Sequence, residues 1–162
     1  MLSERWGFQE TIWTSSSTKP RPRLVLDTNI WISAFLTRGP PSEIVQMAEE
    51  RLVEVFVSLE MMDEINRVLQ YEKIIGILKR TRTRSSTVMG TIARLSSIVD
   101  VKAEVHVVDE DPSDNHVLAC AKEAGAQFVV SGDRHLLTLG RYGNAKIVGA
   151  SGFLQIQRTR KR

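Results

Sequence analysis

The sequence has only one cysteine and no long apolar run. Cys120 by itself excludes an intramolecular disulfide and a cysteine-rich zinc site. It also lies on a predicted helix face that looks buried, and buried thiols are usually inert, so we expect no catalytic nucleophile there. No apolar stretch approaches the ~20 residues of a membrane-spanning helix, and the N-terminus lacks the charged-then-apolar pattern of a signal peptide. We therefore expect a cytoplasmic protein without a membrane segment.

Several sequence patterns of catalysis are missing as well. There is no phosphate-cradling glycine loop and no G-x-S-x-G nucleophile elbow. A haloacid-dehalogenase-like phosphatase would need an aspartate where Asn29 stands, and a receiver-like phosphorylation domain would need an acidic pair after its first strand. The histidines lack the spacing of metal ligands, so we interpret them as structural or solvated, with a phosphate contact left open for His116 and His135.

Length and charge limit the organisation of the chain. Its 162 residues suffice for one folded domain. We divide the chain into an N-terminal extension (1–22), a folded domain (23–156) and a basic C-terminal tail (157–162). The net charge is +3, and basic residues cluster at 79–84 and in the tail. Such clusters are typical either of solvated surface or of contacts with nucleic acid.

From Arg23 onward, short apolar runs alternate with longer stretches of helical periodicity. The predicted strands span 24–26, 53–57, 104–108, 128–130 and 146–148. The predicted helices span 30–36, 42–51, 59–69, 86–98, 112–124 and 134–139, with a loop or helical turn at 79–87. Strands that consist mostly of Val, Leu, Ile and Phe and are separated by helices indicate a parallel sheet covered on both faces. The fold class is therefore a three-layer α/β/α sandwich with a mainly parallel central sheet.

Two aspartates follow predicted strands directly or after a short turn. Asp27 comes after Leu24–Leu26, and Asp133 follows the strand at 128–130 through Ser131 and Gly132. In an open parallel sheet the functional crevice lies beyond the carboxyl ends of the strands. Each aspartate also precedes a predicted helix, where aspartate is a favoured N-cap, so capping is the plainer explanation for each one taken singly.

Two further acids lie on predicted helices near the same edge. Asp114 shares a helix face with Val117, Leu118 and Ala121, which places a carboxylate on the stripe that should meet the core. The alternative role is that of a capping-box partner, three residues after a cap at Asp111. Glu64 lies on the border between the polar and apolar faces of the helix at 59–69.

The four acids together predict a metal site. Carboxylates that converge on one sheet edge repel each other and stay ionised only with cations nearby. Mg²⁺ or Mn²⁺ prefers oxygen ligands, which suits a set without cysteine or clustered histidine. One or two such ions activate water and stabilise both oxygens of an in-line phosphoryl displacement. The predicted chemistry is metal-dependent hydrolysis of a phosphodiester.

Four segments of the chain resemble the PIN domain, the PilT N-terminus fold of metal-dependent ribonucleases. They are LVLDTNIWISAFL from Leu24, VSLEMMDEINRVL from Val57, DEDPSDNHVLACAKEAGAQFVVSGDRHLL from Asp109, and IVGASGFL from Ile147. The form D-P-x-D-N at 111–115 is similar to the branch of the family that contains toxins of toxin–antitoxin pairs. The resemblance covers about residues 23 to 156.

The resemblance implies a ribonuclease with RNA as substrate, Mg²⁺ or Mn²⁺ as cofactor, a homodimer and a cognate antitoxin. The catalytic and metal-binding residues would be Asp27, Glu64, Asp114 and Asp133. We expect Asn29, Ser131 and Asp111 to orient these ligands through hydrogen bonds, and Arg80, Arg82 and Arg84 to contact RNA phosphates. The alternative is a module of the same fold that binds RNA or a protein without cutting.

Overall fold

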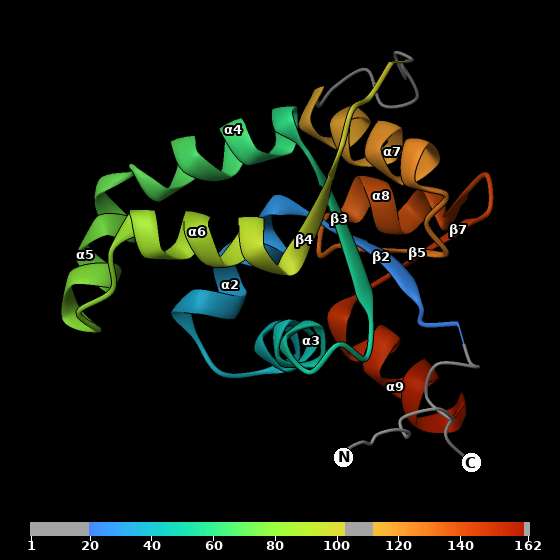
Figure 1. The fold of residues 1–162 in the computed structure, drawn as a ribbon, viewed down its shortest axis with the longest axis horizontal. Coiled ribbons are helices and arrows are strands. Elements are labelled where there is room, and N and C mark those ends of the chain that lie inside the picture. The colour runs from blue at the N-terminus through green and yellow to red at the C-terminus, as the bar shows by residue number, and fades with distance from the viewer. Residues whose placement is uncertain (1–19, 103–111, 161–162) are drawn as a thin grey trace, which may run out of the picture.

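A computed structural model describes residues 20–102 and 112–160 of the chain. Its centre is a six-stranded sheet in the order β4-β3-β2-β5-β7-β6 (Figure 1). Strands β2 (Arg23–Leu26), β3 (Glu54–Ser58), β4 (Ser96–Val99), β5 (Phe128–Val130) and β7 (Ala145–Val148) pair in parallel, and β6 (Arg141–Tyr142) is an antiparallel edge strand. The three central strands β3, β2 and β5 therefore end at one edge of the sheet.

Helices lie on both faces of the sheet, and the described part of the chain has eight of them: α2 (Thr28–Leu36), α3 (Pro40–Glu49), α4 (Leu59–Leu69), α5 (Glu72–Arg80), α6 (Ser85–Leu95), α7 (Pro112–Ala124), α8 (Arg134–Leu139) and α9 (Ala150–Arg160). Helices α4, α5 and α6 form an arm that projects from the sheet, with α5 at its far end (Figure 1). None of the described helices combines the length and apolarity needed to cross a membrane.

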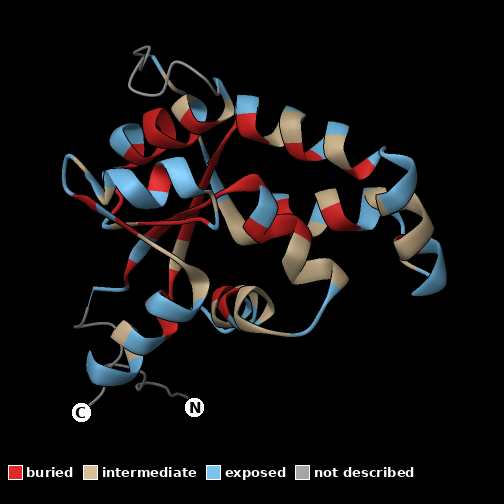
Figure 2. Ribbon diagram, turned by 180° about the vertical axis from the view of Figure 1, so that it is seen from behind, coloured by how far each residue is buried: buried red, intermediate tan, exposed pale blue. Residues whose placement is uncertain are grey.

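Side-chain alternation along β2 shows how the two faces are filled. Leu24 and Leu26 pack with Trp31 and Ile44 on the face covered by α2, α3 and α9. Val25, between them, packs on the opposite face against α7. Because successive strand residues point to opposite faces, an all-apolar strand requires a cover on both sides. The central strands β3, β2 and β5 are accordingly buried along most of their length (Figure 2), and the three-layer architecture predicted from the sequence is confirmed.

Most predicted elements appear within a few residues of the expected bounds, and the ranges 59–69, 112–124 and 134–139 match α4, α7 and α8. The prediction of helix over 86–98 was wrong at its end, because α6 stops at Leu95 and Ser96–Val99 forms β4. This strand lies at the sheet edge with Ser96 and Ser97 in its first half, so it lacks the apolar run of the central strands. The predicted strand at 104–108 falls outside the described residues.

The region predicted as a loop or helical turn at 79–87 is helical at both of its ends. Helix α5, which the sequence did not predict, continues to Arg80, and α6 begins at Ser85. At the C-terminus, α9 continues to Arg160, so residues 157–160 of the basic tail belong to a helix.

Candidate metal centre

Asp27 lies at the point where β2 ends and α2 begins. Its backbone N–H donates to the carbonyl oxygen of Val130 at 2.9 Å, which continues the ladder between β2 and β5 by one residue. Its side chain accepts from the Thr28 N–H at 2.7 Å and caps α2. The residue is only 4% exposed, so a carboxylate is held inside the protein at the carboxyl edge of the sheet.

Ser131 connects the two aspartates that follow the strands. Its buried hydroxyl donates to Asp27 Oδ2 at 2.7 Å and accepts from the backbone N–H of Asp133 at 2.9 Å. One hydroxyl therefore sets the orientation of the first carboxylate and the backbone position of the second. Ser131 was predicted from the sequence to orient a metal ligand, and its hydroxyl does contact Asp27. A metal-binding role for Asp27 and Asp133 stays a prediction.

Asp133 caps α8. Its Oδ1 accepts from the N–H groups of His135 at 2.8 Å and Leu136 at 3.4 Å. The plainer explanation, N-cap aspartates, thus holds for both Asp27 and Asp133. Capping does not exhaust either side chain, because an ionised carboxylate has about four acceptor sites and a cap uses one or two of them.

Asp114 enters the site from α7. It is 2% exposed and lies on the buried face of that helix, as the helical spacing predicted. Asp114, Asp133 and His135 each offer one ligand atom, and these atoms lie within 4.8 Å of one another. His135 Nδ1 is also 3.8 Å from Asp133 Oδ1. From the sequence, His135 was expected to be structural or solvated, with a phosphate contact left open. Its position two residues after Asp133 was the signal for a place in the cluster.

The charge environment of Asp27 connects the remaining acid, Glu64, to this cluster. Burial raises the pKa of Asp27 above its ordinary value, and the hydrogen bonds from Ser131 and Thr28 oppose that rise. The negative charges of Glu64 and Asp133 raise the pKa of Asp27 further. Glu64 is half-buried on α4. Asp27, Glu64 and Asp133 therefore act on one another electrostatically, and Asp114 is connected to this group through its approach to Asp133.

Among the described residues, the other predicted site residues are not brought into the cluster. Asn29 is exposed, and its side chain makes no hydrogen bond within the described part of the chain. Asp111 lies outside the described residues. Arg80 ends α5, and Arg82 and Arg84 follow it, at the end of the arm that points away from α7 and α8 (Figure 1). Any contact of these arginines with a substrate would be made away from the acids.

The donor set fits a hard divalent cation. Ligands on opposite sides of Mg²⁺ are roughly 4.2 Å apart, twice the Mg²⁺–oxygen distance. The 4.8 Å that encloses the ligand atoms of Asp114, Asp133 and His135 is slightly wider. The His135 side chain is 51% exposed, so its ring is not locked in place by core packing. A cation would also offset the burial and the mutual repulsion that together raise the pKa of Asp27.

A mostly parallel sheet with acids at its carboxyl edge defines an α/β domain with a candidate metal site. Residues 23–135 match the PIN domain family, and the chain belongs to that family. Among solved structures, the chain is similar to the RRP44 PIN domain of T. brucei, with 14% sequence identity, a TM-score of 0.47, and coverage of 87% of this chain and 83% of that chain. No curated protein sequence matches the chain.

Proposed function

We propose that this PIN domain is a metal-dependent ribonuclease that hydrolyses RNA phosphodiester bonds. The observation that carries the proposal is the approach of acids from four separate elements to one edge of the sheet. Asp27 follows β2, Glu64 lies on α4, Asp114 lies on α7 and Asp133 precedes α8. Burying such a set costs stability, because it places like charges together in a region of low polarity. A role in metal-dependent catalysis explains why the chain keeps these acids together despite the lost stability.

Asp114, Asp133 and His135 would hold one Mg²⁺ or Mn²⁺ ion, with Asp27 and Glu64 completing the negative site or holding a second ion. When bound, the ion supplies an activated water and stabilises charge on the phosphodiester oxygens. Asp27 is kept in one orientation by Thr28 and Ser131, and Asp133 by the first turn of α8. These hydrogen bonds fix the acids before substrate arrives, so little reorganisation is needed during the reaction.

The experiment that tests the proposal is cleavage of a mixed pool of structured and single-stranded RNA with Mn²⁺, Mg²⁺ or EDTA. We expect cleavage with either metal and none with EDTA. Calorimetric titration of the protein with Mn²⁺ should give a heat of binding. A chain that binds RNA equally well in EDTA, shows no heat with metal and never cleaves RNA would instead be a binding module, and the proposal would be abandoned.

We propose that the arginines at the end of the arm contact RNA away from the cleavage point, and Arg82 allows a clean test. Arg82 has a left-handed backbone with φ of 56° just after α5, where glycine is favoured. Arg82→Gly therefore removes the charge without disturbing the turn. We expect single-stranded RNA to bind roughly tenfold more weakly, with a salt slope smaller by roughly 0.7. Fluorescence anisotropy at several salt concentrations measures the affinity and the salt slope. Unchanged values would show that Arg82 does not contact RNA.

The finer biological assignment is that this ribonuclease is the toxin of a toxin–antitoxin pair and acts as a homodimer. It is supported by the D-P-x-D-N form at 111–115, whose first residue lies outside the described chain. The experiment that addresses it is co-purification of the chain with the small DNA-binding protein encoded by a neighbouring gene, if such a gene is present. The cytoplasmic location predicted from the sequence stays a prediction.

A further inference from the structure

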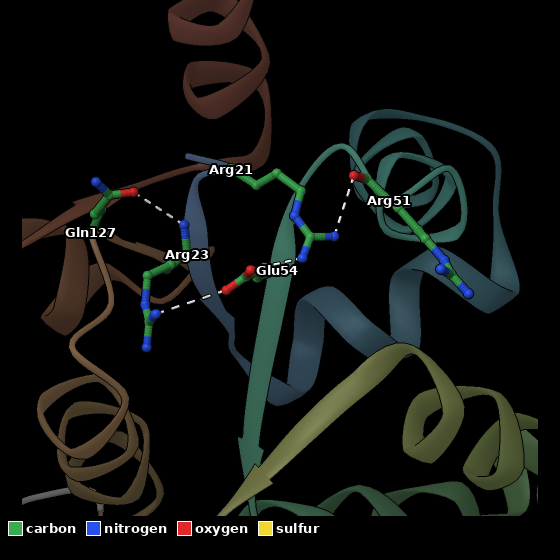
Figure 3. Close-up of polar contacts among 5 residues, drawn as sticks. All are labelled: Arg21, Arg23, Arg51, Glu54 and Gln127. Atoms are coloured by element: carbon green, nitrogen blue, oxygen red, sulfur yellow. Dashed lines mark hydrogen bonds and ion pairs between the residues drawn. The ribbon is translucent and has the colours of Figure 1, made fainter. Parts of the chain in front are cut away.

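A second charged feature lies at the opposite edge of the sheet from the acids. It is a groove of about 740 Å³ at the amino-terminal ends of β2, β3 and β4. Its charged lining residues are Arg21, Arg23, Glu49, Arg51, Glu54 and Arg94. They come from the residues before and within β2, the end of α3 and the turn after it, the start of β3, and α6. Figure 3 shows Arg21, Arg23, Arg51 and Glu54 around this edge.

Three of the arginines are held in place by glutamates. Glu54 accepts from Arg21 at 2.8 Å and lies 3.8 Å from Arg23 (Figure 3). The guanidinium of Arg23 also lies 4.7 Å from the centre of the Phe56 ring. On the other side of the groove, Arg94 donates two hydrogen bonds to Glu49, at 2.9 and 3.1 Å. The guanidinium groups are therefore oriented before any ligand arrives, which lowers the entropy cost of binding one.

Arg51 differs from the other three arginines. Its carbonyl oxygen accepts from Arg21 at 3.5 Å, but its exposed guanidinium makes no hydrogen bond or ion pair with any described residue. Its backbone is left-handed, with φ of 60°. Hydrogen bonds from Arg51 N–H to Ala48 and from Leu52 N–H to Met47 form the Schellman ending of α3, in which glycine is the favoured residue at the position of Arg51. The chain thus places an unpaired arginine where glycine would be less strained.

The composition of the groove favours a polyanion over a small apolar ligand. Four arginines and two glutamates line it, which gives the groove a formal charge of +2. Apart from the half-buried Leu95, its apolar lining residues are at most 9% exposed, so charged side chains form most of the accessible surface. Small-molecule pockets are lined mainly by apolar side chains, whereas guanidinium groups match the geometry of phosphate oxygens.

We propose that this groove binds the phosphate backbone of RNA as a second contact, remote from the acidic edge. The identity of the polyanion rests on the proposed function, since a ribonuclease meets RNA, but the contact itself does not require cleavage. Arg51 makes the new ion pair with a phosphate, and Arg21, Arg23 and Arg94 hold the adjacent backbone. Base contacts play no part, so the groove adds affinity without sequence preference.

Arg51→Gly in the full-length chain tests the proposal. The experiment measures binding of a labelled single-stranded RNA in EDTA, where no metal-dependent cleavage occurs. We expect roughly tenfold weaker binding and a salt slope smaller by roughly 0.7, because one charge-assisted phosphate contact is lost. The melting temperature should stay the same or rise, because glycine relieves the left-handed strain. If Arg51 had only a structural role, Arg51→Gly would lower the melting temperature and leave RNA binding unchanged.

Arg38→Gly is the matched control, because Arg38 is exposed after α2 and does not line the groove. Its binding should stay within about twofold of the native value, since no phosphate contact is lost. Equal losses of RNA affinity in Arg51→Gly and Arg38→Gly would show that binding responds to net charge alone. That result would overturn the proposal that the groove binds RNA. Native affinity in both Arg51→Gly and Arg51→Glu would also overturn it, as would a native chain that binds no RNA. Metal-dependent cleavage is scored separately, so the nuclease proposal stands or fails by itself.

Discussion

Asp27→Asn is expected to lower metal-dependent RNA cleavage by roughly 10³-fold, because a metal site supplies several kcal/mol of transition-state stabilisation and ~1.4 kcal/mol corresponds to a factor of ten in rate. The substitution removes one negative charge from the buried edge of the sheet but preserves the shape of the side chain. The amide oxygen can still accept from Thr28, and the amide NH₂ can donate to the second lone pair of Ser131. The loss of activity would therefore report charge rather than misfolding.

Asp63→Asn is the control for this experiment. Asp63 is exposed on α4, one residue before Glu64, and the change has the same chemistry. We expect full activity from it. The measurement is the initial rate on the RNA pool with Mn²⁺, for three proteins purified in the same way. Equal residual cutting by the native chain and Asp27→Asn would mean that a contaminating nuclease does the cutting, and it would remove the support for this site.

In EDTA at pH 7, Asp27→Asn is expected to melt at a higher temperature than the native chain. Burial and the charges of Glu64 and Asp133 raise the pKa of Asp27, so the ionised form destabilises the folded state. The variant has no such charge. For a chain of this length, each kcal/mol recovered raises the melting temperature by roughly 2–4 °C. Added Mn²⁺ should reverse the order, because only the native site binds the ion tightly and is stabilised by it.

The pH dependence of this difference follows from the direction of the pKa change. Because the folded-state pKa of Asp27 is raised, the folded state holds this proton more tightly than the unfolded state does. The native chain therefore recovers stability as the pH falls through the folded pKa, and the penalty has vanished below roughly pH 4, where the group is protonated in both states. Thermal melts of both proteins between pH 7 and pH 4 should converge. A constant difference over that range would show that Asp27 is not the titrating group.

Much of the acidic edge could be predicted from local patterns. Asp27 and Asp133 follow apolar runs of strand length, and parallel strands bring their carboxyl ends to one edge. Asp114 shares a helical face with core residues, and the structure buries it there. These inferences need only the periods of strands and helices, which the order of residues encodes directly. The PIN domain resemblance, which the family match confirms, rests on the same segments.

Local patterns failed where neighbours in space decide the structure. Ser96–Val99 forms a strand because its backbone pairs with the free edge of β3. The segment has no apolar run that would have predicted a strand. His135 lies near Asp114 and Asp133 because the turn that begins α8 brings it there. Its distance in sequence from the other histidines is not that of metal ligands, so spacing alone did not indicate this position. The bridge from Ser131 to Asp27 spans 104 residues of sequence.

The α/β layers and the acids at strand ends can be read from the order of residues, because they depend on the periodicity of apolar residues and on the residue types that come directly after each strand. Which charges meet depends instead on how the elements pack in three dimensions. That packing placed Glu64 within the field of Asp27, and it assembled an arginine groove at the other edge from segments far apart in the chain. The physical reason is that electrostatic interactions depend on distance and burial, which are set when the whole sheet and its helices pack together.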